Sequence, residues 1–382
     1  MAHKIVIGMT GTFGSGCSFI SENYIKPQGY SYIVLSDILK EYYKKEHNGQ
    51  RANRQQLQEF GNELRLKEGA DFLAKEALKT IENKHDQKWI IDSIRNPAEI
   101  EYLQNNLGKF YLISVFADPE QRWERVQADY SRDRRLFEKD EEKDSGKKEP
   151  PYGQKVTDCH LLADFIINNN EPIIGKNKNH ELLNKKINRF LGLVEGEKTF
   201  SPESNETLMT IAYANSKRAN CLKRNVGAII ADEYGNVISS GTNSVPILGS
   251  NCQEVFGNCY RDEQRNKIKD FLGRFISFED KGTVNEFLKE NFKILDYCRA
   301  LHAEERAIIN LIRAGPPSLQ RAKLYTTTFP CNLCALKIIQ INIPTVVFLE
   351  PYPQQESYQM LNDRGIYQEP FEGITFNGYF RF

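Results

Sequence analysis

Short apolar runs alternate with longer amphipathic stretches along the first half of the chain. The apolar runs are rich in β-branched residues and predict buried strands. They lie at residues 4–8, 88–92 and 110–116. Apolar residues at helical spacing predict helices over 98–105, 120–130 and 179–193. Strands that alternate with helices indicate a mostly parallel sheet with helices on both faces.

The second half begins with a predicted amphipathic helix at 206–219 and continues in a different order. A strand at 226–231, a turn rich in Asp, Gly and Asn, and a strand at 237–241 predict an antiparallel hairpin. Two further strands are predicted at 322–327 and 345–349, and a predicted helix precedes each of them. The order of predicted helices and strands in the second half therefore differs from that in the first half.

Two stretches interrupt these patterns. Residues 192–202 contain two glycines, a proline and several polar residues, and we place a domain boundary there. The boundary predicts one domain at 1–195 and a second at 203–382. Residues 132–151 are dense in charges of both signs, which predicts a solvated loop.

Length and composition narrow the class of protein. The 382 residues give room for two domains that each bury an adequate core. Lysine plus arginine and aspartate plus glutamate both number 51, and zero net charge argues against a general affinity for nucleic acid backbones. We see no signal-peptide pattern and no stretch of transmembrane length, so we expect a cytoplasmic protein that does not enter a membrane. Eight irregularly placed cysteines then favour metal binding over disulfides.

Two short stretches carry the strongest chemical signal. His302-Ala303-Glu304 and Pro330-Cys331-Asn332-Leu333-Cys334 match the pattern His-x-Glu and Pro-Cys-x-x-Cys, which is typical of zinc-dependent nucleoside and nucleobase deaminases. One imidazole and two thiolates can hold Zn²⁺ and leave a fourth position for water, whose pKa the metal lowers. Glu304 is near enough to His302 to carry protons without binding the metal. Both stretches are predicted to begin helices, whose N-termini favour thiolates.

Alternatives remain for the cysteines. A chance Cys-x-x-Cys beside an unrelated histidine is disfavoured, because four residue types coincide with a proline and a fitting helix context. Cys252, Cys259 and Cys298 are candidates for a second, structural zinc, although the sequence names no fourth ligand. Buried thiols without a metal are the alternative for these three.

A glycine-rich loop follows the first predicted strand. It matches the P-loop pattern Gly-x-x-x-x-Gly-Lys-[Ser/Thr], except that Cys17 replaces the lysine. The loop can still cradle phosphates with backbone N–H groups, but it lacks the cation that phosphoryl transfer needs. We therefore expect a nucleotide-binding loop without kinase activity, and a structural relic is the alternative. The nucleotide-binding candidates are Gly11, Gly14, Ser15, Gly16 and Ser18.

The first half resembles the P-loop nucleoside monophosphate kinase-like proteins, including the dephospho-coenzyme A kinase relatives. Besides the P-loop, the resemblance rests on Gly61–Arg65, Ile91–Pro97 and Ala163–Asn169. It implies a kinase-like parallel sheet in which Asp92 takes the place of a Walker B carboxylate. It also implies a second interpretation of residues 132–151, as a mobile lid. The lid arginines that could contact phosphates are Arg132, Arg134 and Arg135.

The second half resembles the deoxycytidylate deaminases of the zinc cytidine deaminase superfamily over residues 204–370. Beyond the zinc motif, the resemblance rests on Val226–Ile230, Gly241–Pro246, Cys259–Asp262, Cys298–Glu305 and Leu324–Thr327. It implies an α/β/α sandwich and a homo-oligomer such as a hexamer. It also implies a zinc ion held by His302, Cys331 and Cys334, with Glu304 as the catalytic residue. The substrate-binding residues that it implies are Asn243, at the sugar, and Ala303.

Two features depart from the family pattern. Arg306 stands where the family has Asn, and the connection from 261 to 297 is long enough to predict two helices, at 262–275 and 283–292. The order of the two domains also resembles bacterial antiphage deaminases that act on dCTP as well as on dCMP.

We therefore predict hydrolytic deamination of deoxycytidine nucleotides, dCMP, dCTP or both, to deoxyuridine nucleotides and ammonia. The setting would be nucleotide metabolism and antiphage nucleotide depletion, with a regulatory nucleotide at the P-loop. One alternative is a nucleotide sensor with a vestigial deaminase, which the intact zinc motif opposes. Another is a cytidine or adenosine deaminase of nucleic acids, which the zero net charge and the absence of an aromatic–basic stripe oppose.

Overall fold

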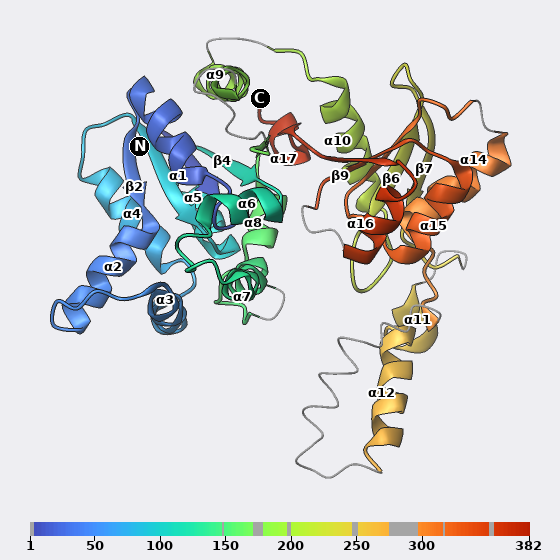
Figure 1. Ribbon diagram of the computed structural model, residues 1–382, viewed down its shortest axis with the longest axis horizontal. Coiled ribbons are helices and arrows are strands. Elements are labelled where there is room, and N and C mark those ends of the chain that lie inside the picture. Colours follow the sequence, from blue (N-terminus) through green and yellow to red (C-terminus); the bar gives the residue numbers. More distant parts are fainter. Residues whose placement is uncertain are drawn as a thin grey trace. The chain divides into compact units, whose positions relative to one another are not determined.

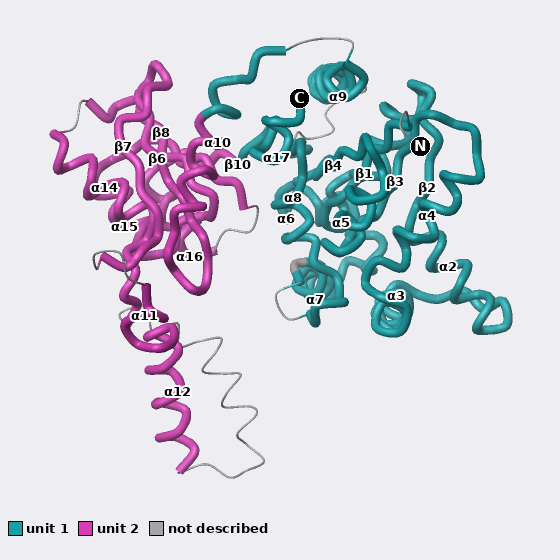
Figure 2. Tube along the Cα trace, turned by 180° about the vertical axis from the view of Figure 1, so that it is seen from behind, with its two compact units in different colours: residues 1–207, 370–382 teal, residues 208–369 magenta. Residues whose placement is uncertain are grey.

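The computed structural model describes residues 4–146, 149–170, 179–196, 200–246, 251–274, 297–315, 318–350 and 355–382. The chain divides into two compact units (Figures 1 and 2): a first unit of residues 1–207 and 370–382, and a second unit of residues 208–369. Within the described residues, no helix has the length and apolar character needed to cross a membrane. The helix predicted at 283–292 lies outside the described residues.

The first unit contains a sheet with strand order β11-β5-β4-β1-β3-β2. Its strands are β1 (Ile5–Thr10), β2 (Ser31–Val34), β3 (Lys88–Ile94), β4 (Lys109–Phe116), β5 (Phe165–Asn168) and β11 (Gly373–Ile374). The pairings β1–β3, β1–β4, β2–β3 and β4–β5 are parallel, and β11 is antiparallel to β5. The predicted mostly parallel sheet is confirmed.

Helices cover both faces of this sheet. They are α1 (Cys17–Ile20), η1 (Ser21–Ile25), η2 (Lys26–Gln28), α2 (Leu35–Glu46), α3 (Arg54–Glu68), α4 (Phe72–Glu82), α5 (Pro97–Asn106), α6 (Pro119–Val126), α7 (Arg134–Ser145), α8 (Val156–Leu162), α9 (Asn179–Glu195) and α17 (Phe376–Tyr379). On one face, Ile7 and Ile113 share a core with Phe190 of α9. Side chains alternate along a strand, so the neighbouring Ser114 points to the other face, where its hydroxyl meets His160 of α8 at 2.8 Å.

Residues 370–382 belong to the first unit, whereas the second predicted domain ran to residue 382. Gly373 pairs with Ile166 at the edge of the sheet, and α17 follows. The fully buried carboxylate of Glu206 accepts the N–H of Ile374 at 2.7 Å and is held by Arg189 at 2.6 and 2.8 Å. A strand as short as β11 has no hydrophobic periodicity, which is why the sequence pattern could not assign it.

The charge-rich stretch from residue 132 contains a helix, so the prediction of a solvated loop is wrong for α7. Phe137 is buried, with its ring centroid 5.5 Å from that of Trp123 and 5.7 Å from that of Tyr130. Asp144 is buried as well and forms an ion pair with Arg95. Distant partners thus neutralise part of the charge that made the stretch resemble a loop.

The second unit contains a sheet with strand order β10-β9-β8-β6-β7. Its strands are β6 (Gly227–Ala231), β7 (Val237–Thr242), β8 (Lys323–Thr326), β9 (Thr345–Phe348) and β10 (Tyr367–Pro370). Strand β6 is antiparallel to both β7 and β8, and β8 is parallel to β9. The predicted hairpin and the two later strands are therefore present.

Helices also cover both faces of the second sheet. They are α10 (Ser204–Ser216), which begins in the first unit, α11 (Cys252–Phe256), α12 (Tyr260–Leu272), α14 (Ala303–Ala314), α15 (Asn332–Ile341) and α16 (Gln355–Asn362). Ile230 of β6 shares a core with Ala307 of α14 and Ala335 of α15. On the other face α10 lies so close to Gly227 that a Cβ there would be 2.0 Å from the carbonyl oxygen of Ala212. The predicted α/β/α sandwich is confirmed.

Arg189→Ala should destabilise the first unit, because it leaves the buried Glu206 carboxylate without its cation. Removing one partner of a buried ion pair costs about 3–5 kcal/mol of unfolding free energy. Lys185→Ala is the matched control on α9, since its ion pair with Glu181 is exposed and should be worth about 0.5 kcal/mol or less. Both tryptophans, Trp89 and Trp123, lie in the first unit, so urea unfolding followed by tryptophan fluorescence reports on it. Equal unfolding midpoints for the two variants would contradict this role of Glu206.

Candidate metal and catalytic site

The three candidate metal ligands come from the starts of two helices. His302 is the N-cap residue of α14, and Cys331 is the N-cap residue of α15. Cys334 lies in the first turn of α15, where it is buried. A helix begins at each position because the backbone carbonyls of His302 and Cys331 accept the N–H groups of Arg306 and Ala335, at 2.9 and 2.8 Å.

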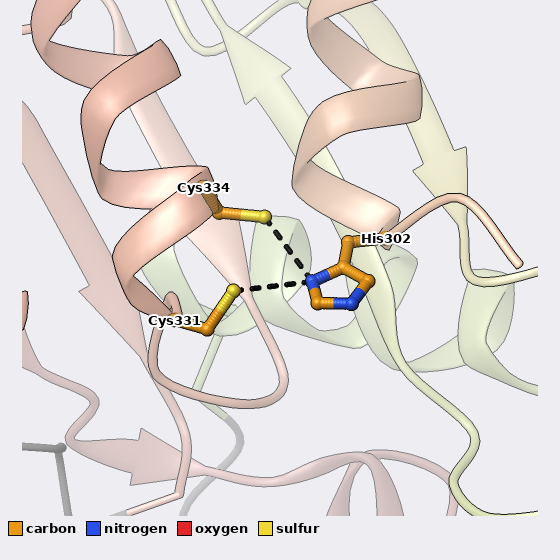
Figure 3. A group of neighbouring side chains, drawn as sticks. All are labelled: His302, Cys331 and Cys334. Carbon is orange, nitrogen blue, oxygen red and sulfur yellow. Dashed lines mark hydrogen bonds between the residues drawn. The ribbon is translucent and has the colours of Figure 1, made fainter. Parts of the chain in front are cut away.

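These three side chains converge in the second unit, as Figure 3 shows. The Nδ1 atom of His302 is 3.2 Å from the Sγ of Cys331 and 3.4 Å from the Sγ of Cys334. A tetrahedral zinc ion with bonds of about 2.0–2.3 Å needs donor atoms about 3.5 Å apart, so the spacing fits the ion. The donor set also fits, because one imidazole and two thiolates leave a fourth position open. Within the described parts of the chain, this is the one group of histidine, cysteine or acidic side chains close enough together to hold a metal.

The local electrostatics favour a thiolate in this group. Hydrogen bonds from Cys334 and His302 lower the pKa of Cys331, against the opposing effect of burial. The same hydrogen bond and burial raise the pKa of Cys334, so the first negative charge resides on Cys331. The hydrogen bond to Cys331 raises the pKa of His302. The N-terminal ends of α14 and α15 add a positive potential that favours thiolates at this position.

Glu304 lies beside the metal-ligand group. Its side chain is 4% exposed, and burial raises the pKa of its carboxyl group. Oε2 lies 3.6 Å from the Sγ of Cys334, while Oε1 lies 3.2 Å from the hydroxyl of Thr326 at the end of β8. The carboxyl group thus has one oxygen on the metal side and the other held by a fully buried hydroxyl.

Thr326 was not among the functional residues predicted from the sequence. Its hydroxyl also lies 2.9 Å from the carbonyl oxygen of Thr328, which is a second acceptor for its single hydrogen. A threonine at the end of a buried strand, shortly before Pro-Cys-x-x-Cys, was the available signal. The contact with Glu304 could not be predicted, because it depends on how α14 packs against the sheet.

The two candidate substrate-binding residues lie near the start of α14 and already have contacts in the protein. The amide of Asn243 accepts the N–H of Val226 at 2.7 Å and donates to the carbonyl of Arg224 at 2.7 Å. Each end of the amide keeps one further hydrogen-bonding position, so contact with a sugar stays a prediction. The side chain of Ala303 is fully buried in the core, and its role at the substrate also stays a prediction.

Arg306, the departure from the family pattern, holds the loop after β7. Its guanidinium donates to the hydroxyl of Ser244 at 2.9 Å and to the carbonyl of Ser244 at 3.0 Å. Ser244 also bridges to Leu301, the residue before His302. The substitution therefore ties the loop that carries Asn243 to the segment that carries the metal ligand.

The P-loop candidates lie in the first unit. Gly14 and Gly16 have positive φ angles of 80° and 102°, which favour glycine. The hydroxyl of Ser18 donates to the predicted Walker B carboxylate of Asp92 at 2.7 Å. The backbone carbonyl of Ser15 accepts the side-chain amide of Asn169 at 2.8 Å, and Gly11 precedes this turn. The structure therefore brings the loop and Asp92 together, whereas nucleotide binding stays a prediction.

Most of the second unit matches a known protein family. Residues 202–350 match the family model described as the cytidine and deoxycytidylate deaminase zinc-binding region, which agrees with the sandwich fold and the His–Cys–Cys group. The deoxycytidylate deaminase of Enterobacteria phage T2 is 31% identical over 158 residues, which cover 39% of this chain and 81% of that protein. The chain belongs to the deoxycytidylate deaminase family, whose zinc-binding region it contains.

Two further relatives match larger parts of the chain. The deoxycytidylate deaminase of Saccharomyces cerevisiae is 30% identical over 222 residues, which cover 56% of this chain and 60% of that protein. The chain thus spans less than two thirds of that relative. A UPF0200 protein of Sulfurisphaera tokodaii is 30% identical over 183 residues, which cover 47% of this chain and 96% of that protein, and its likeness fits a fusion with a kinase-like N-terminal domain.

Cys334→Ala should remove the metal, because two remaining ligands cannot complete the tetrahedral set. The wild-type protein should contain about one zinc per chain by elemental analysis, and the variant close to none. Cys298→Ala is the matched control, since Cys298 is outside the metal-ligand group, and it should keep the metal. A full equivalent of zinc in Cys334→Ala would refute the ligand assignment. Zinc loss in Cys298→Ala would favour the second site considered for Cys252, Cys259 and Cys298.

Proposed function

We propose that the protein hydrolytically deaminates deoxycytidine nucleotides to deoxyuridine nucleotides and releases ammonia. The observation that carries this proposal is the position of the buried Glu304 carboxyl group, which lies 3.6 Å from Cys334 at the edge of the His302–Cys331–Cys334 group. A proton carrier beside three metal ligands is the arrangement that attack of water on an amino-substituted ring requires. Family membership supports the pyrimidine nucleotide as the substrate class.

The chemistry divides between the metal and the chain. A zinc ion bound by His302, Cys331 and Cys334 would supply a Lewis acid that makes water a nucleophile near neutral pH. Glu304 would accept one proton of the attacking water and deliver it to N3 of the cytosine ring as the oxygen bonds to C4. It would then transfer the second proton to the departing amino group, so that ammonia leaves and the C4 carbonyl forms. Both protons of the water are accounted for, and Glu304 ends as it began.

The environment of Glu304 suits this role. A carboxyl group that both accepts and returns protons works best when its pKa is near the working pH, and burial raises the pKa of Glu304 in that direction. Thr326 holds Oε1 and leaves Oε2 toward the metal ligands. The hydroxyl of Thr326 therefore orients the oxygen that carries the protons.

The choice of substrate follows from the family and from the charge of the chain. We propose dCMP, dCTP or both as substrates, and depletion of these nucleotides during phage infection as the biological setting. A deaminase acting on nucleic acids is a weaker proposal, because equal numbers of acidic and basic residues provide no overall attraction for a polyanion. The homo-oligomer stays a prediction.

A substrate panel tests the proposed function. Purified full-length protein is incubated separately with dCMP, dCTP, cytidine and single-stranded DNA, and ammonia and the deaminated base are measured. Release of ammonia from a free deoxycytidine nucleotide with none from DNA is the expected result. Deamination of DNA alone would support the nucleic-acid enzyme, and no deamination of any substrate by zinc-loaded protein would favour the nucleotide sensor.

Glu304→Gln should abolish most turnover while the metal site stays intact. Glutamine keeps the shape of the side chain but cannot carry protons, so kcat should fall by about 10²–10⁴-fold, the usual contribution of general acid–base catalysis. Glu305→Gln is the matched control: it removes the neighbouring carboxylate, which pairs with Lys337, and should leave kcat within about tenfold of wild type. Zinc content is measured on both variants. A near-normal rate for Glu304→Gln would show that another group carries the protons.

A further inference from the structure

The glycine-rich loop of the first unit binds a carboxylate group that belongs to the protein itself. The backbone N–H of Phe13, between Gly11 and Gly14, donates to Oδ2 of Asp144 at 3.2 Å. Asp144 lies in the last turn of α7, and its side chain is 1% exposed. Negative charge is unfavourable at the C-terminal end of a helix, so other groups must stabilise the carboxylate there.

Two arginines provide that stabilisation, and a third binds the loop and a neighbouring carboxylate of α7. Nη1 of Arg95 lies 2.9 Å from Oδ1 of Asp144, and Nη2 of Arg54 lies 3.7 Å from Oδ2. The guanidinium of Arg54 also stacks 3.7 Å above the ring of Phe13, against the loop. Arg122 donates to the carbonyl of Phe13 at 3.3 Å and pairs with Glu141, one turn before Asp144 on α7.

These guanidinium groups therefore gather around the loop, and each meets a carboxylate of α7. Guanidinium groups together with loop N–H groups are the donors that bind phosphate in proteins. The carboxylates of α7 thus contact the guanidinium and N–H groups that would bind a phosphate chain.

Arg95 is also placed to replace the lysine that the loop lacks. Burial and the nearby Asp92 raise the pKa of the Cys17 thiol to about 12, so Cys17 stays neutral. Arg95 is joined to the loop through Asp144, because the carboxylate that its Nη1 meets at 2.9 Å also accepts the N–H of Phe13. Asp92 itself is held by the hydroxyls of Ser18 and Tyr32, at 2.7 Å each.

We propose that the loop, Arg95 and Arg54 form a binding site for the phosphate chain of a nucleotide, and that Asp144 of α7 occupies this site until the ligand displaces it. The cation that Cys17 cannot provide comes from Arg95, which directly follows β3. The ligand releases α7 because it takes over the same donors. In the protein without a ligand, the carboxylate of Asp144 therefore occupies the site.

Ligand binding to the full-length protein tests this assignment. The probes are inorganic tripolyphosphate, ATP and adenosine, followed by calorimetric titration. Tripolyphosphate and ATP should bind and adenosine should not, because the site recognises the phosphate chain. Binding of ATP without binding of tripolyphosphate would show that the base makes the necessary contacts, and would overturn a site defined by the loop and its arginines.

Asp144→Asn removes the competing charge and keeps the side chain's shape. It should bind tripolyphosphate about tenfold more tightly than wild type, the factor expected if the site is closed in about nine molecules of ten. Adding Arg95→Gln to this variant should weaken binding by about tenfold or more, because a charged hydrogen bond is lost. Glu138→Gln is the control on the same helix: Glu138 is exposed and pairs with Arg134, so its removal should leave the affinity unchanged.

A structural role for the ion pairs predicts something different. If Asp144 only stabilises the fold, a folded Asp144→Asn will melt earlier and bind tripolyphosphate no more tightly than wild type, and the proposal fails. Hydrogen exchange of the wild-type protein covers the case in which the variant does not fold. Tripolyphosphate should raise exchange in residues 134–145 and lower it in residues 11–18. Binding without faster exchange in α7 would show that the ligand does not displace Asp144. The site itself would be overturned if wild type does not bind tripolyphosphate at about 1 mM, the weak end of specific affinity, and Asp144→Asn also fails to bind or to fold.

Discussion

The direct packing of α14 against the backbone of β7 is the constraint on which the site in the second unit depends. A Cβ at Gly241 would lie 2.1 Å from the carbonyl oxygen of Ala303 and 2.4 Å from the nitrogen of Ala307, so the helix can lie there only because position 241 has no side chain. The hydroxyl of Ser239 donates to the carbonyl of Ala307 at 2.6 Å and fixes the same contact. Since His302 caps this helix, the close approach determines where the imidazole lies. Strands β8 and β9, on either side of α15 in the sequence, then determine where the two cysteines meet it.

The chemistry of the site could be predicted from the sequence, and its supporting contacts could not. His302, Cys331 and Cys334 were predicted because residue type and spacing encode zinc ligation and both motifs lie at the start of a helix. Thr326 was missed because its contact with Glu304 depends on the packing of α14 against β8. The contact between Arg306 and Ser244 was missed for a related reason, since it joins a helix to a loop at the end of β7.

Buried carboxylates explain why two parts of the first unit departed from prediction. Glu206 attaches residues 370–382 to the sheet through Ile374, and Asp164, fully buried, pairs with Arg381 at 2.6 Å. Neither partner is near in sequence, so a pattern-based boundary assigned this segment to the second domain. Asp144 does the same for α7, where local charge density predicted a loop. In each case an arginine compensates the desolvation of the acid, and only the folded structure brings the pair together.

We propose that one nitrogen and two sulfur ligands from the starts of two helices hold a single zinc ion beside Glu304. X-ray absorption spectroscopy at the zinc edge of the purified protein can identify these ligands. We predict two sulfur scatterers at about 2.3 Å and one imidazole nitrogen at about 2.0–2.1 Å, with a further light atom completing the tetrahedron. Four sulfur scatterers, or none, would contradict the assignment of the zinc to His302, Cys331 and Cys334.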